Sequence, residues 1–368
     1  MKYVHQLKDW PTFSWNKEVV LSRLVEIRHQ QGRLVGQMEG LGFSLKSEAS
    51  LSTITQDVLK TNEIEGNDLD RNEVRSSIAR KLGLKIAGLV PVSRNVDGVV
   101  EMMLDATNNC NKDLTLARLF NWQSLLFPDG FGRNSELVRG NWRNNTVDDP
   151  MQVISGAMGF ERVHFQAPDS HIVNSEMESF IKWVNSTKAL DPVLKAAVAH
   201  LWFVTVHPFD DGNGRIARAI ADMFLARADG GSQRFYSMSS QISNNRKQYY
   251  DLLEKTQKGS LDITDWMMWF LSTLEGAMLA SKKTLKVTLQ KAKFWEKHAS
   301  TPFNKRQSKI INKLFSDFDG NLTSSKWAKM GKCSQDTAGR DINDLLQKLV
   351  LKKAKGGGRN TSYLLRLV

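Results

Sequence analysis

The chain has 368 residues, 41% of them hydrophobic, and a formal net charge of +12. This length and composition predict a globular protein of two or three units with buried cores. Its two cysteines, Cys110 and Cys333, exclude a disulfide framework and a cysteine-rich zinc site. The sequence begins without the apolar core of a signal peptide and contains no apolar run near the roughly 20 residues that cross a bilayer. We therefore expect a cytoplasmic protein without a membrane role.

The basic residues are concentrated near the end of the sequence. From Phe303 to Val368 there are 14 Lys and Arg against 5 Asp, a net charge of +9. Such an excess is typical of a separate module that faces phosphate or another acidic surface, and a solvated tail is the plain alternative.

Apolar residues recur at helical spacing along most of the chain, which predicts a mainly α fold. The predicted helices cover residues 15–43, 48–62, 71–82, 92–109, 113–126, 174–186, 191–206, 213–228, 244–258 and 262–298. The exception is the segment 150–168, where two β-prone stretches flank SGAMG and predict a hairpin.

The stretch HPFDDGNGRIAR, residues 207–218, joins two of these helices. Asn213 and Gly214 stand where the second helix begins, after a glycine that tolerates unusual backbone angles. Free N–H groups at a helix start attract anions, so we expect this loop to cradle phosphates. Arg215 and Arg218 lie three residues apart, and their forked donors can hold phosphate oxygens from one helix face.

The same loop offers acids and a base. Asp210 or Asp211 can hold Mg²⁺ against phosphates, and His207 is a natural proton acceptor for an incoming nucleophile. A metal-hydrolase site is the alternative, but it needs further ligands, and the other six histidines show no such spacing. These are His5, His29, His164, His171, His200 and His298.

With every fixed position filled, HPFDDGNGRIAR resembles the signature of the Fic family. Members of this type transfer AMP from ATP to a Tyr, Thr or Ser hydroxyl of a target protein, so the resemblance implies a protein adenylyltransferase. It also implies that the hairpin at 150–168 is a flap that docks the target. The sequence GNGR, in place of the lysine-containing form of related kinase-like toxins, favours nucleotidyl transfer.

The resemblance assigns a role to each residue of the motif. His207 would take the proton of the target hydroxyl as it attacks the α-phosphorus of ATP, and Asp211 would hold Mg²⁺. Asn213, with the backbone at Gly212 and Gly214, would cradle the α- and β-phosphates, and Arg215 would bind the β- or γ-phosphate. Arg218 would brace the loop or contact phosphate. Pro208 would shape the turn, and Phe209 would pack inward.

Far upstream, TNEIEGN at 61–67 resembles the family's inhibitory motif, with Thr61, Glu65 and Gly66 at its fixed positions. The Glu65 carboxylate, presented to Arg215, would form a forked ion pair and occupy the place of the γ-phosphate. A plain helix end with a solvated Glu and a Gly cap is the alternative. The motif precedes the catalytic loop, as in the family's second class, and in some relatives the same Glu supports removal of AMP.

Two further stretches carry weaker resemblances. In NNRKQYYDLLEKTQKGS, Tyr249 and Gln257 match the positions that contact adenine in the family, although Asn is frequent at the second position. Residues eight apart on a helix lie on nearly one face, which is compatible with joint contact. The stretch WPTFSWN near the start resembles a domain often found ahead of bacterial Fic cores.

The tail predicts three helices, then a strand, a Gly-rich turn and a strand, an order that resembles a winged helix. Ser334 would cap the third helix. That helix offers Gln335, Thr337 and Arg340 but also Asp336, Asp341 and Asp344, and the predicted wing carries Lys352, Lys353, Lys355 and Arg359. Because phosphate would repel the three acids, the sequence slightly favours a protein partner over DNA.

The sequence thus predicts a mainly α protein: a Fic helical core with a β-hairpin flap, an N-terminal helical domain and a C-terminal winged helix. The expected domains are 1–90, 91–280, a connecting helix at 281–302, and 303–368. The first functional hypothesis is an autoinhibited adenylyltransferase that uses ATP and Mg²⁺ and modifies a target protein or itself, as a monomer or a homodimer. The alternatives are an enzyme that mainly removes AMP, and a DNA-binding regulator whose Fic core senses nucleotide.

Overall fold

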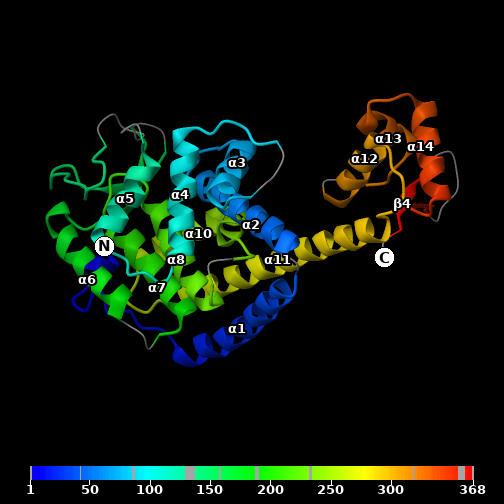
Figure 1. The fold of residues 1–368 in the computed structure, drawn as a ribbon. Coiled ribbons are helices and arrows are strands. Elements are labelled where there is room, and N and C mark those ends of the chain that lie inside the picture. Colours follow the sequence, from blue (N-terminus) through cyan, green and yellow to red (C-terminus); the bar gives the residue numbers. More distant parts are fainter. Residues whose placement is uncertain are drawn as a thin grey trace. The chain divides into compact units, whose positions relative to one another are not determined.

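The computed structural model describes residues 2–41, 43–84, 88–128, 137–156, 159–186, 190–231, 234–316, 318, 320–354 and 361–366. The chain divides into two compact units, Met1–Ser281 and Lys282–Val368 (Figure 1). Within the described residues, no helix is both long and apolar enough to cross a membrane.

Helices make up most of both units. In chain order they are a short 3-10 helix η1 (Val4–Gln6), α1 (Lys17–Glu39), α2 (Phe43–Ile64), α3 (Arg71–Lys81), α4 (Arg94–Asn108), α5 (Leu116–Leu126), α6 (Ser170–Ser186), α7 (Pro192–Val206), α8 (Asn213–Asp229), α9 (Met238–Asn244), α10 (Arg246–Gln257), α11 (Thr264–Lys297), α12 (Lys305–Ser316), α13 (Ser324–Gly331) and α14 (Gln335–Gln347). The strands are β1 (Gln152–Ser155), β2 (Arg162–Gln166), β3 (Leu351–Lys353) and β4 (Tyr363–Leu365).

The strands form two separate antiparallel hairpins. In the first, Gln152 of β1 pairs with Gln166 of β2, and the register shifts after Val153. In the second, Leu351 of β3 pairs with Leu365 of β4. The predicted mainly α fold and the hairpin expected at 150–168 are confirmed, and the tail has the predicted order of three helices and two strands. The sequence missed α9, which has only seven residues and is rich in Ser and Asn.

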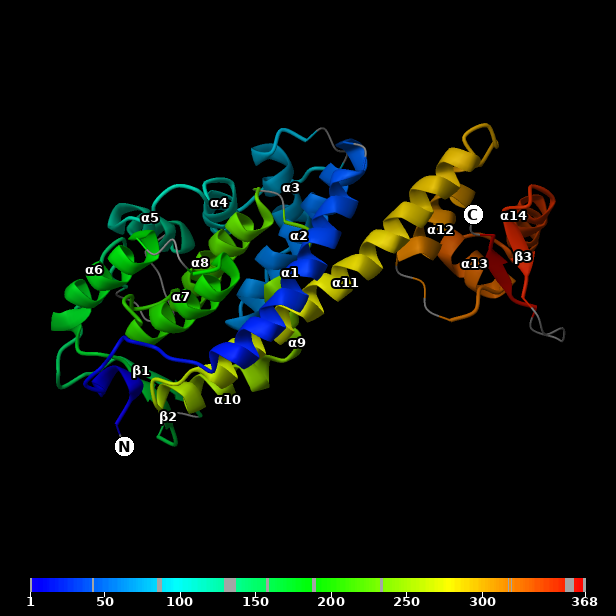
Figure 2. The same ribbon diagram turned by 90° about the horizontal axis from the view of Figure 1, so that it is seen from below.

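Helix α7 forms the centre of the first unit. Every residue from Val193 to Val206 is buried, because its sequence is apolar on all faces, as expected of a helix surrounded by others. Helix α8 packs along it, and the two lie side by side in both views (Figure 2). The loop between them, residues 207–212, therefore begins at the end of a helix that is buried along almost its whole length.

Helix α2 packs against α3, α4, α8 and α9. Its last residues reach the start of α8, where the Arg218 Nε donates a hydrogen bond to Thr61 Oγ1 at 2.7 Å. The chain then turns at Gly66, whose φ of 78° lies in the left-handed region that favours glycine. The predicted inhibitory segment thus lies beside the predicted catalytic loop, although the two are about 150 residues apart in sequence.

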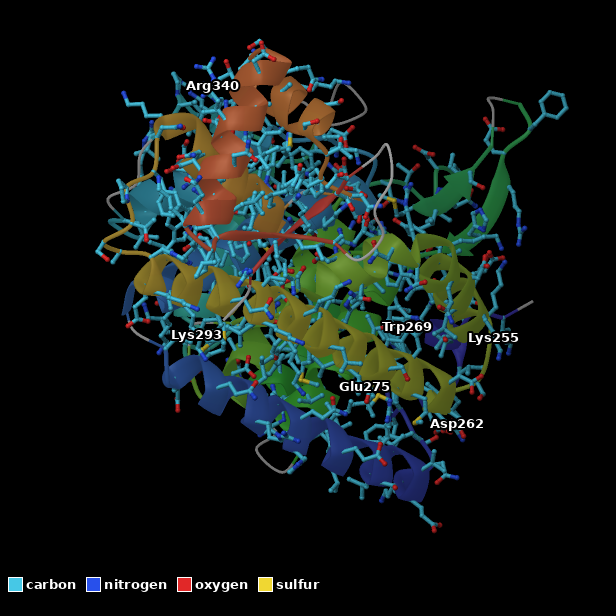
Figure 3. The ribbon with its side chains drawn as sticks, turned by 90° about the vertical axis from the view of Figure 1, so that its right-hand side faces the viewer. Lys255, Asp262, Trp269, Glu275, Lys293 and Arg340 are labelled. Carbon is cyan, nitrogen blue, oxygen red and sulfur yellow. The ribbon has the colours of Figure 1, made fainter. Side chains whose placement is uncertain are left out.

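Helix α1 contacts the first half of α11 through polar groups. Glu275 of α11, which Figure 3 labels, accepts hydrogen bonds from Arg23 and from Gln30 of α1. Helix α11 is continuous past Ser281 into the second unit.

The second unit has its own core. Trp327 at its centre is fully buried. The core side chains come from α11 to α14, from the start of β3 and from the residues just before α13 and β3: Phe294, Ile310, Ile311, Leu322, Trp327, Ala328, Ala338, Ile342, Leu345, Val350 and Leu351. An independent core of this kind is the mark of a separate domain.

Candidate active site

The loop between α7 and α8 is held in an unusual backbone conformation. His207 has φ 50° and ψ 56°, a left-handed conformation that costs a non-glycine residue energy. Gly212 has φ 91°, and a Cβ there would lie 2.9 Å from Leu126 Cδ1. The loop therefore needs glycine at 212 and external support at 207.

Arg143 provides that support, although no local pattern in the sequence distinguishes this residue. Its Nε donates to the His207 carbonyl at 2.8 Å, its backbone N–H donates to the Pro208 carbonyl at 3.0 Å, and its Nη2 donates to the Pro168 carbonyl. The side chain is almost fully buried, and burial lowers the pKa of Arg143 to about 10, so it remains charged at neutral pH. A guanidinium at the carboxyl end of α7 also complements the helix dipole.

The imidazole of His207 is set up as a base. Its Nδ1 lies 3.2 Å from the Val204 carbonyl, which can only accept, so Nδ1 carries the proton and Nε2 is left with its lone pair. Burial, together with the charge of Arg143, lowers the pKa of His207 to about 4, although the hydrogen bond to the Val204 carbonyl acts in the opposite direction. The ring is therefore neutral, and able to take a proton, at physiological pH.

The start of α8 is occupied by a carboxylate. A Cβ built on Gly214 would collide with Glu65 Oε1, so this oxygen lies directly against the backbone of the first turn. A helix start of this kind, with free N–H groups and the positive end of the dipole, is an anion site. Glu65 thus sits where the sequence places a phosphate.

Arg218 holds this carboxylate in place. Its Nη2 lies 2.6 Å from Glu65 Oε1 and 2.9 Å from the Thr61 carbonyl. The side chain of Glu65 is 27% exposed, whereas that of Arg218 is 2% exposed. Burial would raise the pKa of Glu65, but the charge and hydrogen bond of Arg218 outweigh it and the pKa lies below its ordinary value.

The ion pair that the structure shows for Glu65 is with Arg218, whereas the sequence predicted one with Arg215. Gly214 and Arg218 are four residues apart and share a face of α8, so an anion on the Gly214 backbone meets Arg218. Arg215 lies 3.6 Å from Asp211 and 5.0 Å from the centre of the Phe127 ring. Its positive charge also lowers the pKa of Glu65.

Arg218 retains capacity for a second anion. Within the described residues, its Nη1 is buried and has no hydrogen-bond partner. This atom would lie 3.2 Å from a Cβ on Gly214, which places it beside the same anion site. An unsatisfied guanidinium N–H in the interior is costly, and a phosphate oxygen would satisfy it.

Two residues that the sequence linked to phosphate or metal brace the loop instead. Asn213 is buried, and its amide accepts from the Phe209 N–H at 3.0 Å and donates to the Phe209 carbonyl at 2.7 Å. Asp210 accepts from the Val138 N–H at 2.9 Å. Each end of the Asn213 amide thus makes one hydrogen bond within the loop, and the expected cradling of phosphate by this residue stays a prediction. Phe209 is fully buried, as expected.

Asp211 is the carboxylate of the loop best placed for Mg²⁺. Its side chain is 35% exposed, and Oδ1 accepts from the Gly212 N–H at 2.6 Å. Within the described residues, no three His, Cys, Asp or Glu side chains gather as a metal site. Mg²⁺ commonly binds through one or two carboxylates together with substrate phosphates, and a single carboxylate beside the anion site fits that pattern.

A cavity of about 800 Å³ lies over this loop. Its walls come from β1 and β2, from α10, and from the catalytic loop with Glu65 at one side. Tyr249 and Gln257 both line it, as the resemblance implies. Their polar groups are engaged, however, because the Tyr249 hydroxyl lies 2.9 Å from His200 Nε2 and the Gln257 amide donates to Thr205 at 3.3 Å.

The first hairpin is fastened to α10 by a polar clamp that the sequence did not reveal. His164 of β2 has Nε2 at 2.5 Å from Ser155 Oγ of β1 and Nδ1 at 2.6 Å from Glu254 Oε2 of α10. Arg162 and Lys258 also contact Glu254. Burial would raise the pKa of Glu254, but these hydrogen bonds outweigh it and hold the pKa at about 2. The hairpin is therefore held over the cavity.

Comparison with known proteins agrees with this arrangement. Residues 113–225 match the Fic/DOC family, and this range includes the loop, α7 and most of α8. Residues 3–84 match DUF4172, a domain of unknown function. This range includes WPTFSWN, α2 and Glu65.

Curated relatives share parts of the chain. A probable protein adenylyltransferase of Aquifex aeolicus is 25% identical over 101 residues, which cover 27% of this chain and 29% of the relative. A protein adenylyltransferase of Caenorhabditis elegans is 41% identical over 58 residues, which cover 15% of this chain and 11% of the relative. The match thus spans less than a third of the length of either relative.

Two solved structures share the fold. A Fic family protein from Desulfovibrio desulfuricans G20 has a TM-score of 0.52 at 18% identity, with 93% of this chain and 95% of that chain covered. A Fic-domain-containing signaling protein from Bacteroides thetaiotaomicron has a TM-score of 0.52 at 19% identity, with 73% and 97% covered. These two structures show a shared fold, and the family matches show that residues 113–225 are similar to the Fic/DOC family and residues 3–84 to DUF4172.

Proposed function

We propose that the protein is an autoinhibited protein adenylyltransferase that moves AMP from ATP to a hydroxyl side chain. The observation that carries the proposal is the Glu65 carboxylate, which lies against the Gly214 backbone and 2.6 Å from Arg218, beside the neutral His207. An inhibitor that occupies an anion site points to an anionic substrate at that site.

The reaction follows from the residues of the loop. The hydroxyl oxygen of the target attacks the α-phosphorus of ATP and gives its proton to His207 Nε2. The new oxygen–phosphorus bond replaces the bond to the β-phosphate oxygen, and pyrophosphate leaves in line with the attack. Arg215 and Arg218, with the N–H groups at the start of α8, stabilise the charge that builds on the phosphates. When bound at Asp211, Mg²⁺ would neutralise part of the same charge.

Inhibition in this proposal is a competition for one place. With Glu65 on Arg218 Nη2, a phosphate group of ATP cannot take that nitrogen and the same helix start, so the α-phosphorus is not aligned for attack. The Glu65 side chain is 27% exposed and borders the cavity, so it can turn away without unfolding of α2. Activation then means displacement of one side chain.

The hairpin is proposed to dock the target. Ile154 and Val163 on its strands are 54% and 38% exposed, and Phe160 near its tip is 86% exposed. An extended segment of the target can pair with a strand edge and place its hydroxyl over the cavity.

The decisive experiment measures incorporation of α-labelled ATP into the protein in the presence of Mg²⁺. Glu65→Gly is expected to label about 10- to 100-fold more than wild type, the factor set by about 1.5–3 kcal/mol for a charge-assisted contact. His207→Ala in the Glu65→Gly background should lower labelling about 100-fold or more. With γ-labelled ATP all variants should stay unlabelled, because the γ-phosphate leaves with pyrophosphate.

Glu63→Gln is the matched control. Glu63 lies two residues before Glu65 but contacts Lys60 and Ser243 away from α8. Its replacement should leave labelling at the wild-type level. Equal labelling by the Glu63→Gln and Glu65→Gln proteins would show that the contact with Arg218 does not inhibit. Labelling from γ-labelled ATP would show kinase chemistry instead.

Removal of AMP is the second candidate activity. It is favoured by the position of Glu65 on the wall of the same cavity as His207, where its carboxylate can orient a water molecule. Protein labelled by the Glu65→Gly variant should then lose AMP when wild type is added and keep it when Glu65→Gln is added. Equal loss of AMP on addition of wild type and of Glu65→Gln would show that Glu65 does not take part in the removal of AMP.

A further inference from the structure

The net positive charge of the protein comes from its second unit. Residues 282–368 contain 20 Lys and Arg against 6 Asp and Glu, a net charge of +14, so the first 281 residues carry −2. A charge of this size on one small unit attracts polyanions. The proposed transferase reaction makes no use of it.

Helices α13 and α14 form a helix-turn-helix pair. Lys332, in the left-handed conformation with φ 49°, makes the turn between them, and Ser334 caps α14 by accepting from the Thr337 N–H. The buried side of α14 consists of Ala338, Asp341, Ile342 and Leu345. Packing through this side leaves the opposite side of α14 in solvent.

Two of the three acids that argued against DNA are paired within the unit. Asp341 is 5% exposed and accepts hydrogen bonds from Arg306, Asn304 and the Trp327 indole. Asp344 accepts from Gln307 at 2.8 Å and Lys348 at 2.6 Å. The unit thus neutralises both carboxylates itself, and the sequence-based preference for a protein partner loses its main reason.

The outer side of α14 carries side chains that read DNA bases. Arg340, Asn343 and Gln347 are exposed at spacings of three and four residues, so they form one stripe (Figure 3 labels Arg340). Arg pairs with guanine, and Asn and Gln pair with adenine, in the major groove. Asp336, near the start of α14, is the acid on this side.

Exposed lysines flank the stripe. Lys329 lies on α13, Lys332 in the turn, and Lys352 and Lys353 on β3. In helix-turn-helix proteins, residues around the recognition helix bind the phosphate backbone and fix the position of that helix in the groove. Lys355 and Arg359, also predicted for the wing, lie outside the described residues.

We propose that the second unit binds duplex DNA, with α14 in the major groove and these lysines on the phosphates. This inference is independent of the proposed transferase activity. Together with the proposed transferase activity, it would hold the enzyme on DNA, so the nucleic acid would determine where the reaction takes place.

The test measures binding of the full chain to a fluorescent 30-base-pair duplex of mixed sequence by anisotropy over a salt series. Four phosphate contacts predict that the logarithm of the association constant falls with the logarithm of salt concentration with a slope of about −3 to −4. This corresponds to about 100-fold weaker binding at 200 mM than at 50 mM salt.

Two charge-matched double variants identify the surface. Lys352→Glu with Lys353→Glu should weaken binding about tenfold or more and reduce the steepness of the salt slope by about 2. Lys8→Glu with Lys17→Glu removes the same charge from exposed positions of the first unit and should leave binding unchanged. His207→Ala should bind DNA as wild type does, which separates this test from that of the transferase.

Absence of binding at 50 mM salt, or equal losses in the two double variants, would overturn the proposal and leave a protein as the partner of this surface. A second readout guards against misfolding, since the Lys352→Glu, Lys353→Glu protein should melt at the wild-type temperature. Arg340→Ala gives a further check, because it should weaken binding without altering the salt slope by more than about 1.

Discussion

Two ion pairs join α2 and the residue after it to neighbouring segments, and they differ in how far their side chains are exposed to solvent. Near its middle, Asp57 pairs with Arg234 in the interior, and their side chains are 6% and 3% exposed. After its last turn, Glu65 pairs with Arg218 at the edge of the cavity and is 27% exposed. The difference indicates that the body of α2 is fixed while the side chain that follows it can exchange with a ligand.

The interior system has fewer cations than anions. Arg234 contacts both Asp57 and Asp222, and the Ser237 hydroxyl donates to Asp57 at 2.5 Å. Burial raises the pKa of Asp57 to about 7, helped by the charge of Asp222 and opposed by that of Arg234. This cluster joins α2 and α8 to the segment before α9, so it sets the position from which Glu65 reaches Arg218.

The strongest test of this comparison removes the shared cation of the interior. Arg234→Met should lower the free energy of unfolding by about 3–5 kcal/mol, because it leaves two carboxylates buried without their partner. Chemical denaturation measures this loss. Arg162→Met, at an arginine that is 70% exposed, should change it by less than about 0.5 kcal/mol. Equal effects would mean that the buried cluster does not anchor α2.

The second test breaks the pair at the cavity. Glu65→Gln should lower the free energy of unfolding by about 1–3 kcal/mol, since Arg218 loses a charged acceptor but keeps Thr61. Its labelling by α-labelled ATP should rise, whereas a structural role alone would leave labelling unchanged. A loss of stability as large as that of Arg234→Met would contradict the distinction between the two systems.

The third test uses pH. A carboxyl whose folded pKa is raised from 3.8 to about 7 costs stability increasingly as the pH rises through that interval. Asp57→Asn cannot ionise, so its stability relative to wild type should improve from pH 4 to pH 7 by at most about 1.4 kcal/mol per pH unit. Unfolding in denaturant at pH 5, 6, 7 and 8 measures the trend, and a constant difference would show that Asp57 is already charged at pH 5.

The smallest expected effect concerns Thr61. Thr61→Val keeps the shape of the side chain but removes the oxygen that accepts from Arg218 Nε. We expect the free energy of unfolding to fall by about 1–2 kcal/mol. Labelling should lie between that of wild type and that of Glu65→Gln, because Arg218 is held less firmly toward Glu65. Labelling equal to that of Glu65→Gln would assign the inhibition to Thr61 as much as to the carboxylate.

The catalytic loop could be predicted from sequence because its parts are neighbours in the chain. His207, Gly212, Gly214 and Arg218 lie within twelve residues, and their roles follow from a helix end and a helix start. The fold class was predictable for a similar reason, since helical spacing is a local pattern.

The contact of Glu65 with Arg218 was not predicted because it depends on how α2 is rotated against α8, which no local pattern encodes. One signal was present, however: Gly214 and Arg218 are four residues apart, so an anion at the first meets the second. Arg143 and the clamp of His164 with Glu254 had no such signal. They join segments 64 and 90 residues apart, and each residue alone looks like an ordinary surface charge.

The contact of Glu65 with the Gly214 backbone also restricts how this protein can change by mutation. A side chain at 214 would expel the Glu65 carboxylate, but it would also fill the place proposed for the phosphate. Activating mutations should therefore arise on the inhibitory segment and inactivating ones in the catalytic loop. Selection for higher activity would therefore change the codons of the segment around Glu65 and leave those of residues 207–218 unchanged.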